Sequence, residues 1–149
     1  MAIELRRSTT FDLALAHERS DCSIGSVLPR VAYLLAQSVL VAAWWLALVL
    51  KPETRDWFRP STAPDEMLLS FWLADLACIV IGSALAAVFV RRRDPRRVPA
   101  LWFISGAMVY ATLSCIAVTA MTGESALGIV LMLPATVMTL AIARAESRS

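Results

Sequence analysis

Hydrophobic residues are gathered into four long stretches, and the polar residues lie almost entirely between and outside them. The stretches cover approximately residues 30–50, 67–90, 99–121 and 125–143. Each is close to the roughly 20 apolar residues that a helix needs to cross about 30 Å of hydrocarbon. The pattern therefore predicts an all-α membrane protein. We expect four transmembrane helices in an antiparallel up-down bundle, forming a single domain over residues 1–149.

The segments that join these stretches differ in length and character. Residues 122–124 are so few that the third and fourth stretches must form a tight hairpin. The first loop, residues 51–66, carries Trp57 and Phe58 between charged residues and is expected to form an interfacial cap. In the cytoplasmic tail over residues 1–29, Thr9 stands three residues before Asp12 and ahead of an apolar run. This capping-box-like spacing predicts a short helix on the membrane surface.

The amino-acid composition excludes several other classes of protein. Hydrophobic residues make up 58% of the chain and charged residues 17%, whereas a soluble domain has roughly 45–50% apolar and about 25% charged residues. A disordered chain, a disulfide-stapled mini-protein and an ordinary soluble enzyme are therefore excluded. Cys22, Cys78 and Cys115 form no CxxC pair, and the last two are expected to be small packing residues.

The distribution of Lys and Arg predicts the orientation. Eleven of these residues lie in the N-terminal tail, the second loop and the C-terminal tail, and three lie in the first loop. Because positive residues collect on the cytoplasmic side, both termini are expected in the cytoplasm, in a plasma membrane of the bacterial (inner-membrane) type. The second loop holds five of the arginines: Arg91, Arg92, Arg93, Arg96 and Arg97. They are a weak candidate for binding lipid headgroups, and serving only to orient the chain is the favoured alternative.

Asp75 is the one Asp, Glu, Lys, Arg or His well inside a hydrophobic stretch, about 12 Å from the start of the second at 1.5 Å per residue. A carboxylate there costs roughly 2.5–3.5 kcal/mol on insertion scales, so it is expected to face inward. Thr112 and Ser114 lie at its depth on the third stretch, close to Tyr110. These four residues form the candidate polar binding site. The alternative is structural: Asp75 protonated and hydrogen-bonded between helices, with hydroxyls bonded to their own helix.

Several chemistries are excluded by what the hydrophobic stretches contain. Haem and di-metal sites need several His or carboxylate ligands within the helices, where this sequence has one Asp and no His. We therefore expect no metal site and no cofactor. HExxH and GxxxxGK[ST] motifs are absent, and the small net charge of +2 does not indicate nucleic-acid binding.

Two functions remain open at this point. The first is a small carrier or binding protein, or an accessory subunit that forms a homodimer or packs against another membrane protein. The second is a membrane-embedded enzyme that acts on a lipid-like substrate with Asp75 as its acid or base. Apart from Asp75, the sequence supports no assignment of a catalytic residue.

Overall fold

The computed structural model describes residues 27–148, and the regular structure within them is helical. Four helices are long and apolar enough to cross a membrane: Val27–Leu50, Asp65–Arg92, Arg97–Thr122 (α5) and Ala126–Glu146 (α6). For residues 27–148, the prediction of an all-helical protein with four such helices is confirmed. We refer to Val27–Leu50 and Asp65–Arg92 as the first and second membrane helices. The short helix expected near Thr9 lies outside the described residues, as does Cys22.

The second membrane helix is not regularly wound. It consists of α2 (Asp65–Leu69), α3 (Trp72–Asp75), a π-helical segment η2 (Leu76–Ile81) and α4 (Gly82–Arg92). π-Helical turns within α-helices are rare and occur mostly at functional sites. Here the π-helical segment begins immediately after Asp75, so the carboxylate lies where the winding changes. The hydrophobic pattern, which is uninterrupted here, predicts only one continuous helix.

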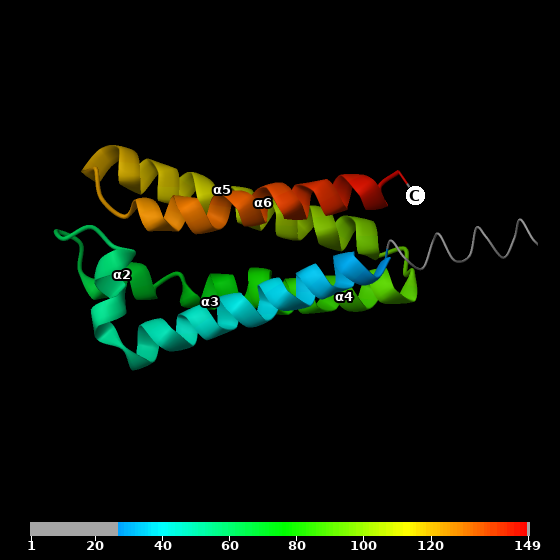
Figure 1. Ribbon diagram of the computed structural model, residues 1–149, viewed down its shortest axis with the longest axis horizontal. Coiled ribbons are helices and arrows are strands. Elements are labelled where there is room, and N and C mark those ends of the chain that lie inside the picture. Colours follow the sequence, from blue (N-terminus) through cyan, green and yellow to red (C-terminus); the bar gives the residue numbers. More distant parts are fainter. Residues whose placement is uncertain (1–26, 149) are drawn as a thin grey trace, which may run out of the picture.

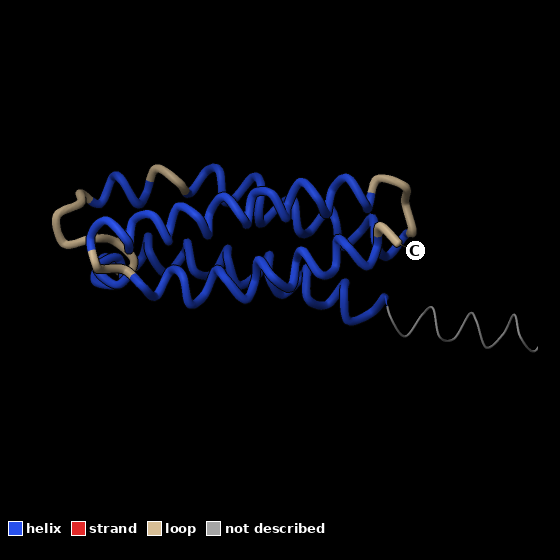
Figure 2. Tube along the Cα trace, turned by 90° about the horizontal axis from the view of Figure 1, so that it is seen from above, coloured by secondary structure: helices blue, strands red, loops and turns tan. Residues whose placement is uncertain are grey.

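α5 and α6 form a closely packed pair that lies side by side in both views (Figures 1 and 2). Gly123 ends α5 in the left-handed region, with φ of 72°, and its N–H donates to the Thr119 carbonyl at 2.8 Å. A Cβ atom at Gly128 would lie 3.2 Å from the Cys115 sulfur. A glycine at position 128 therefore allows the close approach of the two helices.

The loop between the first and second membrane helices is a small folded cap, which we define as residues 51–64. It contains a 3-10 helix, η1 (Pro52–Trp57), with proline in its first turn. Arg55 donates to the Leu48 carbonyl at 2.8 Å and pairs with Asp65 at 2.7 Å. Arg59 approaches the same carboxylate at 2.9 Å. These contacts tie the cap to the ends of both helices that it connects.

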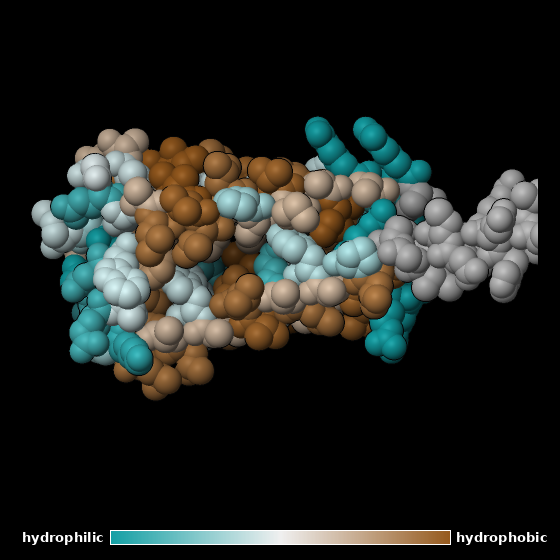
Figure 3. All heavy atoms as spheres, in the orientation of Figure 1, coloured by the Kyte–Doolittle hydropathy of each residue, from teal (hydrophilic) through white to brown (hydrophobic). Residues whose placement is uncertain are grey.

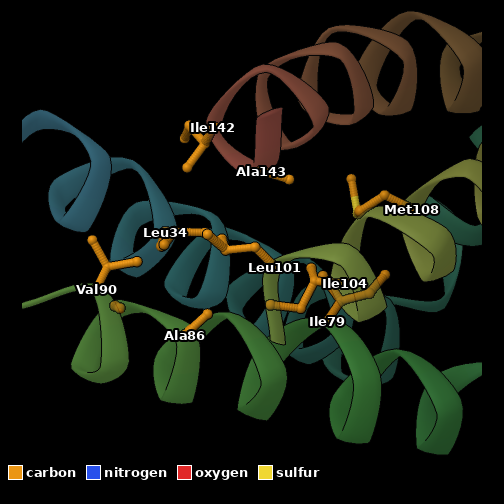
Figure 4. Close-up of a cluster of buried hydrophobic side chains, with 10 residues drawn as sticks. Leu34, Ile79, Ala86, Val90, Leu101, Ile104, Met108, Ile142 and Ala143 are labelled. Atoms are coloured by element: carbon orange, nitrogen blue, oxygen red, sulfur yellow. The ribbon is translucent and has the colours of Figure 1, made fainter. Parts of the chain in front are cut away.

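The core lies toward the opposite end, where the chain passes from α4 to α5 and where the C-terminus lies (Figure 1). Figure 4 shows Leu34 of the first membrane helix directed at Leu101 of α5. Both side chains are fully buried. The core cluster consists of Leu34, Ile79, Ala86, Ala87, Val90, Leu101, Ile104, Met108, Ile142 and Ala143. Residues from all four membrane helices therefore meet at this end, which we call the basic end because Arg91–Arg93, Arg96 and Arg97 lie there.

An ion-pair group crosses the basic end. The Glu146 side chain, 5% exposed, pairs with Arg30 through Oε1 and with the Arg97 Nε atom through Oε2 at 2.9 Å. One carboxylate thus joins the first membrane helix, α5 and α6. In the same region, the Trp102 indole donates to the Ser147 hydroxyl at 2.9 Å.

The molecular surface is sorted by polarity along the long axis. Figure 3 shows hydrophobic side chains over the middle of the molecule and hydrophilic ones toward its two ends. Many large apolar residues of the long helices are exposed, including Leu40, Phe103 and Leu131. A soluble monomer rarely exposes such an extensive apolar surface, whereas a lipid bilayer covers one.

Candidate functional site

A cavity of about 610 Å³ lies between the membrane helices, on the side of the core that faces the cap. Ile79 and Met108 belong both to the core cluster and to the cavity lining, so the core forms the floor of the cavity. Apart from indoles and thiols, the lining contains few polar side chains: Tyr33, Gln37, Arg59, Asp75, Tyr110, Ser114 and Ser125. Pockets that hold small molecules have volumes of roughly 300–1,000 Å³ and this mainly apolar character.

Asp75 lies in the wall of this cavity, at the junction of α3 and η2. Its Oδ2 atom accepts a hydrogen bond from the Trp45 indole N–H at 3.1 Å. Among residues 27–148, no Arg or Lys side chain forms an ion pair with Asp75. The carboxylate is therefore anchored by one neutral donor and remains available from the cavity.

Trp45 is buried, although it lies near the end of the first membrane helix. The sequence places Trp44 and Trp45 near the end of the first membrane helix, where tryptophans commonly face the headgroup region. In the structure Trp45 is only 7% exposed and lies within the protein. Its ring centroid is 4.8 Å from that of Trp44, which in turn is 5.3 Å from that of Phe58 in the cap. A buried indole N–H needs a hydrogen-bond acceptor. The Asp75 carboxylate provides that acceptor and so allows Trp45 to be buried.

The other three predicted site residues have different surroundings. Tyr110 and Ser114 line the same cavity as Asp75, on the α5 side. Tyr110 is nevertheless 68% exposed, and the Ser114 hydroxyl donates to the Tyr110 carbonyl of its own helix at 3.0 Å. Thr112 is buried outside the cavity lining, where its hydroxyl lies 2.7 Å from that of Thr136 on α6. The structure thus brings Asp75, Tyr110 and Ser114 to one cavity and places Thr112 in the α5–α6 interface.

A polar network next to the cavity floor was not anticipated. Gln37, 6% exposed, donates to the Ser83 hydroxyl at 3.2 Å and accepts from the Thr139 hydroxyl at 3.0 Å. Tyr33, one turn earlier, donates to the Ala135 carbonyl at 2.8 Å. These bonds join the first membrane helix to α4 and α6. Gln37 was not predicted as part of the site, although an amide in the middle of an apolar stretch, four residues after Tyr33, is a signal in the sequence that points to such a network.

The cap and the α5–α6 turn meet above the cavity. The Glu124 carboxylate accepts hydrogen bonds from the Ser61 backbone N–H at 2.6 Å and from the Ser61 hydroxyl at 3.0 Å. The backbone N–H, and then the hydroxyl, hold the pKa of Glu124 below its ordinary value. The contact joins the first loop to the third across the end of the molecule.

This contact should depend on pH. Because the pKa of Glu124 is lower in the folded protein than in the unfolded chain, its stabilising effect is present above the ordinary glutamate pKa of 4.5 and is lost as the pH falls through the lowered value. We expect the Ser61 amide to stay protected from hydrogen exchange near neutral pH and to lose protection in acid, after correction for intrinsic exchange. In Glu124→Gln the protection should no longer follow this titration. An unchanged pH profile in that variant would contradict the assignment.

The arginine run of the second loop is divided between two environments. Arg97 is committed to the ion pair with Glu146. Arg91, Arg92 and Arg96 are exposed at the basic end. Their position is compatible with contact to lipid headgroups, which stays a prediction.

Two further observations bear on the kind of site. Within the described part of the chain, no three His, Cys, Asp or Glu residues lie close enough together to hold a metal ion. No family model, curated protein or solved structure matches this chain. The geometry of the cavity is therefore the main evidence on function.

Proposed function

We propose that this chain is a multi-pass plasma-membrane protein that binds a largely apolar small molecule in the cavity between its membrane helices. The observation that carries the proposal is the cavity itself, with about 610 Å³ of space and mainly apolar walls. The space is partly open to the surface of the protein, where the exposed Tyr110 lies in its wall, so an apolar molecule has a route into it.

The proposal includes an orientation. The basic end, with the loop between α4 and α5 and the C-terminus, lies in the cytoplasm, and the cap lies on the other side. This is supported by the excess of Arg and Lys at that end. The cavity is then nearest to the non-cytoplasmic face, in the depth range where amphipathic molecules enter from the outer leaflet.

Unsatisfied polar atoms in the cavity wall also favour a binding role over a purely structural one. Trp44 Nε1 and Ser125 Oγ are buried and have no hydrogen-bond partner among residues 27–148. An unpaired buried donor is costly, so such groups normally find a partner. In this proposal, a polar atom of the bound molecule provides the missing hydrogen-bond partner, and water provides it when the cavity holds no ligand.

The test uses a matched pair of alanines on α5. Ala111 lines the cavity, whereas Ala117 is exposed on the same helix and is not part of the lining. The purified protein, in nanodiscs of zwitterionic lipid, is titrated with the neutral apolar probe diphenylhexatriene, and energy transfer from tryptophan is measured against empty nanodiscs. We expect saturable binding in the unaltered protein and in Ala117→Phe, and its loss in Ala111→Phe, which fills the cavity. Equal signals from all three proteins would overturn the proposal.

A further inference from the structure

Within the described residues, the Asp75 carboxylate has no charge partner. It lies in the wall of a cavity whose lining contains one other charged residue, Arg59. Arg59 is engaged in the cap, where it contacts Asp56 at 2.7 Å, Asp65 at 2.9 Å and the Ala63 carbonyl at 2.6 Å. Among residues 27–148, the Asp75 carboxylate accepts a single hydrogen bond, from the Trp45 indole to its Oδ2 atom. Its Oδ1 atom remains without a partner in that part of the chain.

Aromatic rings lie next to this carboxylate. Trp45, which holds Asp75, contacts Trp44, and Trp44 contacts Phe58. All three rings line the cavity, and they form one continuous aromatic cluster that reaches from the carboxylate to the cap. The face of an aromatic ring carries partial negative charge and attracts organic cations, most strongly when water is excluded.

The residues around Asp75 favour an organic cation over a metal ion, an anion or a neutral ligand. A hard metal ion requires several oxygen ligands, and no cluster of three His, Cys, Asp or Glu residues occurs in the described chain. An organic cation needs one counter-charge and apolar or aromatic contacts for its substituents, both of which are present. An anion would be repelled by Asp75, and a neutral ligand would leave the carboxylate unpaired in apolar surroundings.

We propose that the cavity takes a lipophilic organic cation, with the ammonium-type group between Asp75 and the Trp44–Trp45–Phe58 cluster and the apolar part along α5 and α6. This rests on the proposed binding function and names its ligand class. A carboxylate is costly to place in the membrane, and binding of a cation neutralises its charge. Asp75 therefore makes the cavity selective for cations over neutral and anionic molecules. Trp45 is a positioning residue in the empty protein, since its N–H holds the carboxylate toward the cavity.

The test compares three probes with the same rod-shaped apolar body: neutral diphenylhexatriene, its trimethylammonium derivative and its propionate derivative. Each is titrated into the full-length protein in nanodiscs of zwitterionic lipid, with tryptophan energy transfer measured and empty nanodiscs subtracted. The unaltered protein should bind the ammonium probe about tenfold more tightly than the neutral probe, and the propionate probe least tightly.

Asp75→Asn removes the charge at nearly constant shape. It should weaken binding of the ammonium probe by about tenfold and leave the neutral probe's affinity unchanged. The control is Glu66→Gln, which removes a negative charge from an exposed residue of the second membrane helix that does not line the cavity. The control should retain the preference for the ammonium probe, which excludes a general effect of surface charge.

The outcomes separate the two proposals. Saturable binding of the neutral probe with no preference for the ammonium probe would overturn the assignment of an organic cation and leave the binding function standing. The same holds for a preference that survives Asp75→Asn. No saturable binding of any probe would overturn the binding function itself. The three-probe comparison on the unaltered protein needs no variant, so it decides the question even where Asp75→Asn does not fold.

Discussion

Replacing Leu101 with alanine is expected to lower the free energy of unfolding by about 3 kcal/mol, within the range for fully buried leucines. Leu101 is completely buried in the core cluster, where it meets Leu34 of the first membrane helix (Figure 4). Within a membrane the apolar effect between helices is weak, so the loss comes from van der Waals contacts and the space left behind.

The matched control for this variant is Leu113→Ala. Leu113 lies on the same helix and is 58% exposed, on a surface that lipid covers. Both variants are unfolded by titration with sodium dodecyl sulfate in mixed micelles, and helix content is followed by circular dichroism. We expect Leu113→Ala to stay within about 0.5–1 kcal/mol of the unaltered protein. Equal losses in the two variants would show that the core cluster does not hold the four helices together.

Glu146→Gln is expected to have the second large effect, a loss of about 2–3 kcal/mol. Breaking a buried pair by removing one partner costs more than this, but Arg30 and Arg97 are 25% and 22% exposed, so solvent screens part of the penalty. Without the carboxylate, two guanidinium groups from different helices face each other. The repulsion acts at the end where the four helices are most closely packed.

The same unfolding titration measures this loss, with Glu66→Gln as the control. Glu66 is exposed, so the identical chemical change there should alter stability by no more than about 0.5 kcal/mol. The destabilisation of Glu146→Gln should also increase at low ionic strength, where the two arginines repel each other more strongly. A Glu146→Gln protein as stable as the control would mean that the ion-pair group is incidental.

Much of the secondary structure was predictable because of what a bilayer requires. A chain that crosses lipid must satisfy its backbone hydrogen bonds internally, so a long apolar stretch has essentially one solution. The four helices follow from this constraint, and so does the short turn at Gly123, where a glycine adopts a left-handed conformation. These features depend on the local sequence and on the lipid surroundings that the apolar stretches indicate, so they can be predicted from the sequence.

The candidate site was predictable only in part, because it depends on how the helices are rotated about their axes. Asp75 is identified by charge alone, and the structure places it in a cavity wall. Its partner Trp45 cannot be identified in this way, because an indole near a helix end commonly faces the membrane interface. The rotation of the first membrane helix about its axis is what turns Trp45 inward. Depth alone grouped Thr112 with Ser114, but two residues of a helix separated by two positions point in different directions. The π-helical segment after Asp75 could not be predicted either, because the hydrophobic pattern is uninterrupted there.

The position of the core has a consequence for transport. The cavity is closed toward the basic end by the core cluster, and beyond that by the ion pairs of Glu146. A carrier that works by alternating access must expose its site to each side in turn. Opening this cavity toward the basic end would require Leu34 and Leu101 to separate, and the Glu146 carboxylate to release Arg30 and Arg97. If the protein is a carrier, Leu101→Ala and Glu146→Gln should therefore speed release of a bound probe through the basic end while they lower stability. If it only binds its ligand, both variants should lower stability and leave the release rate unchanged.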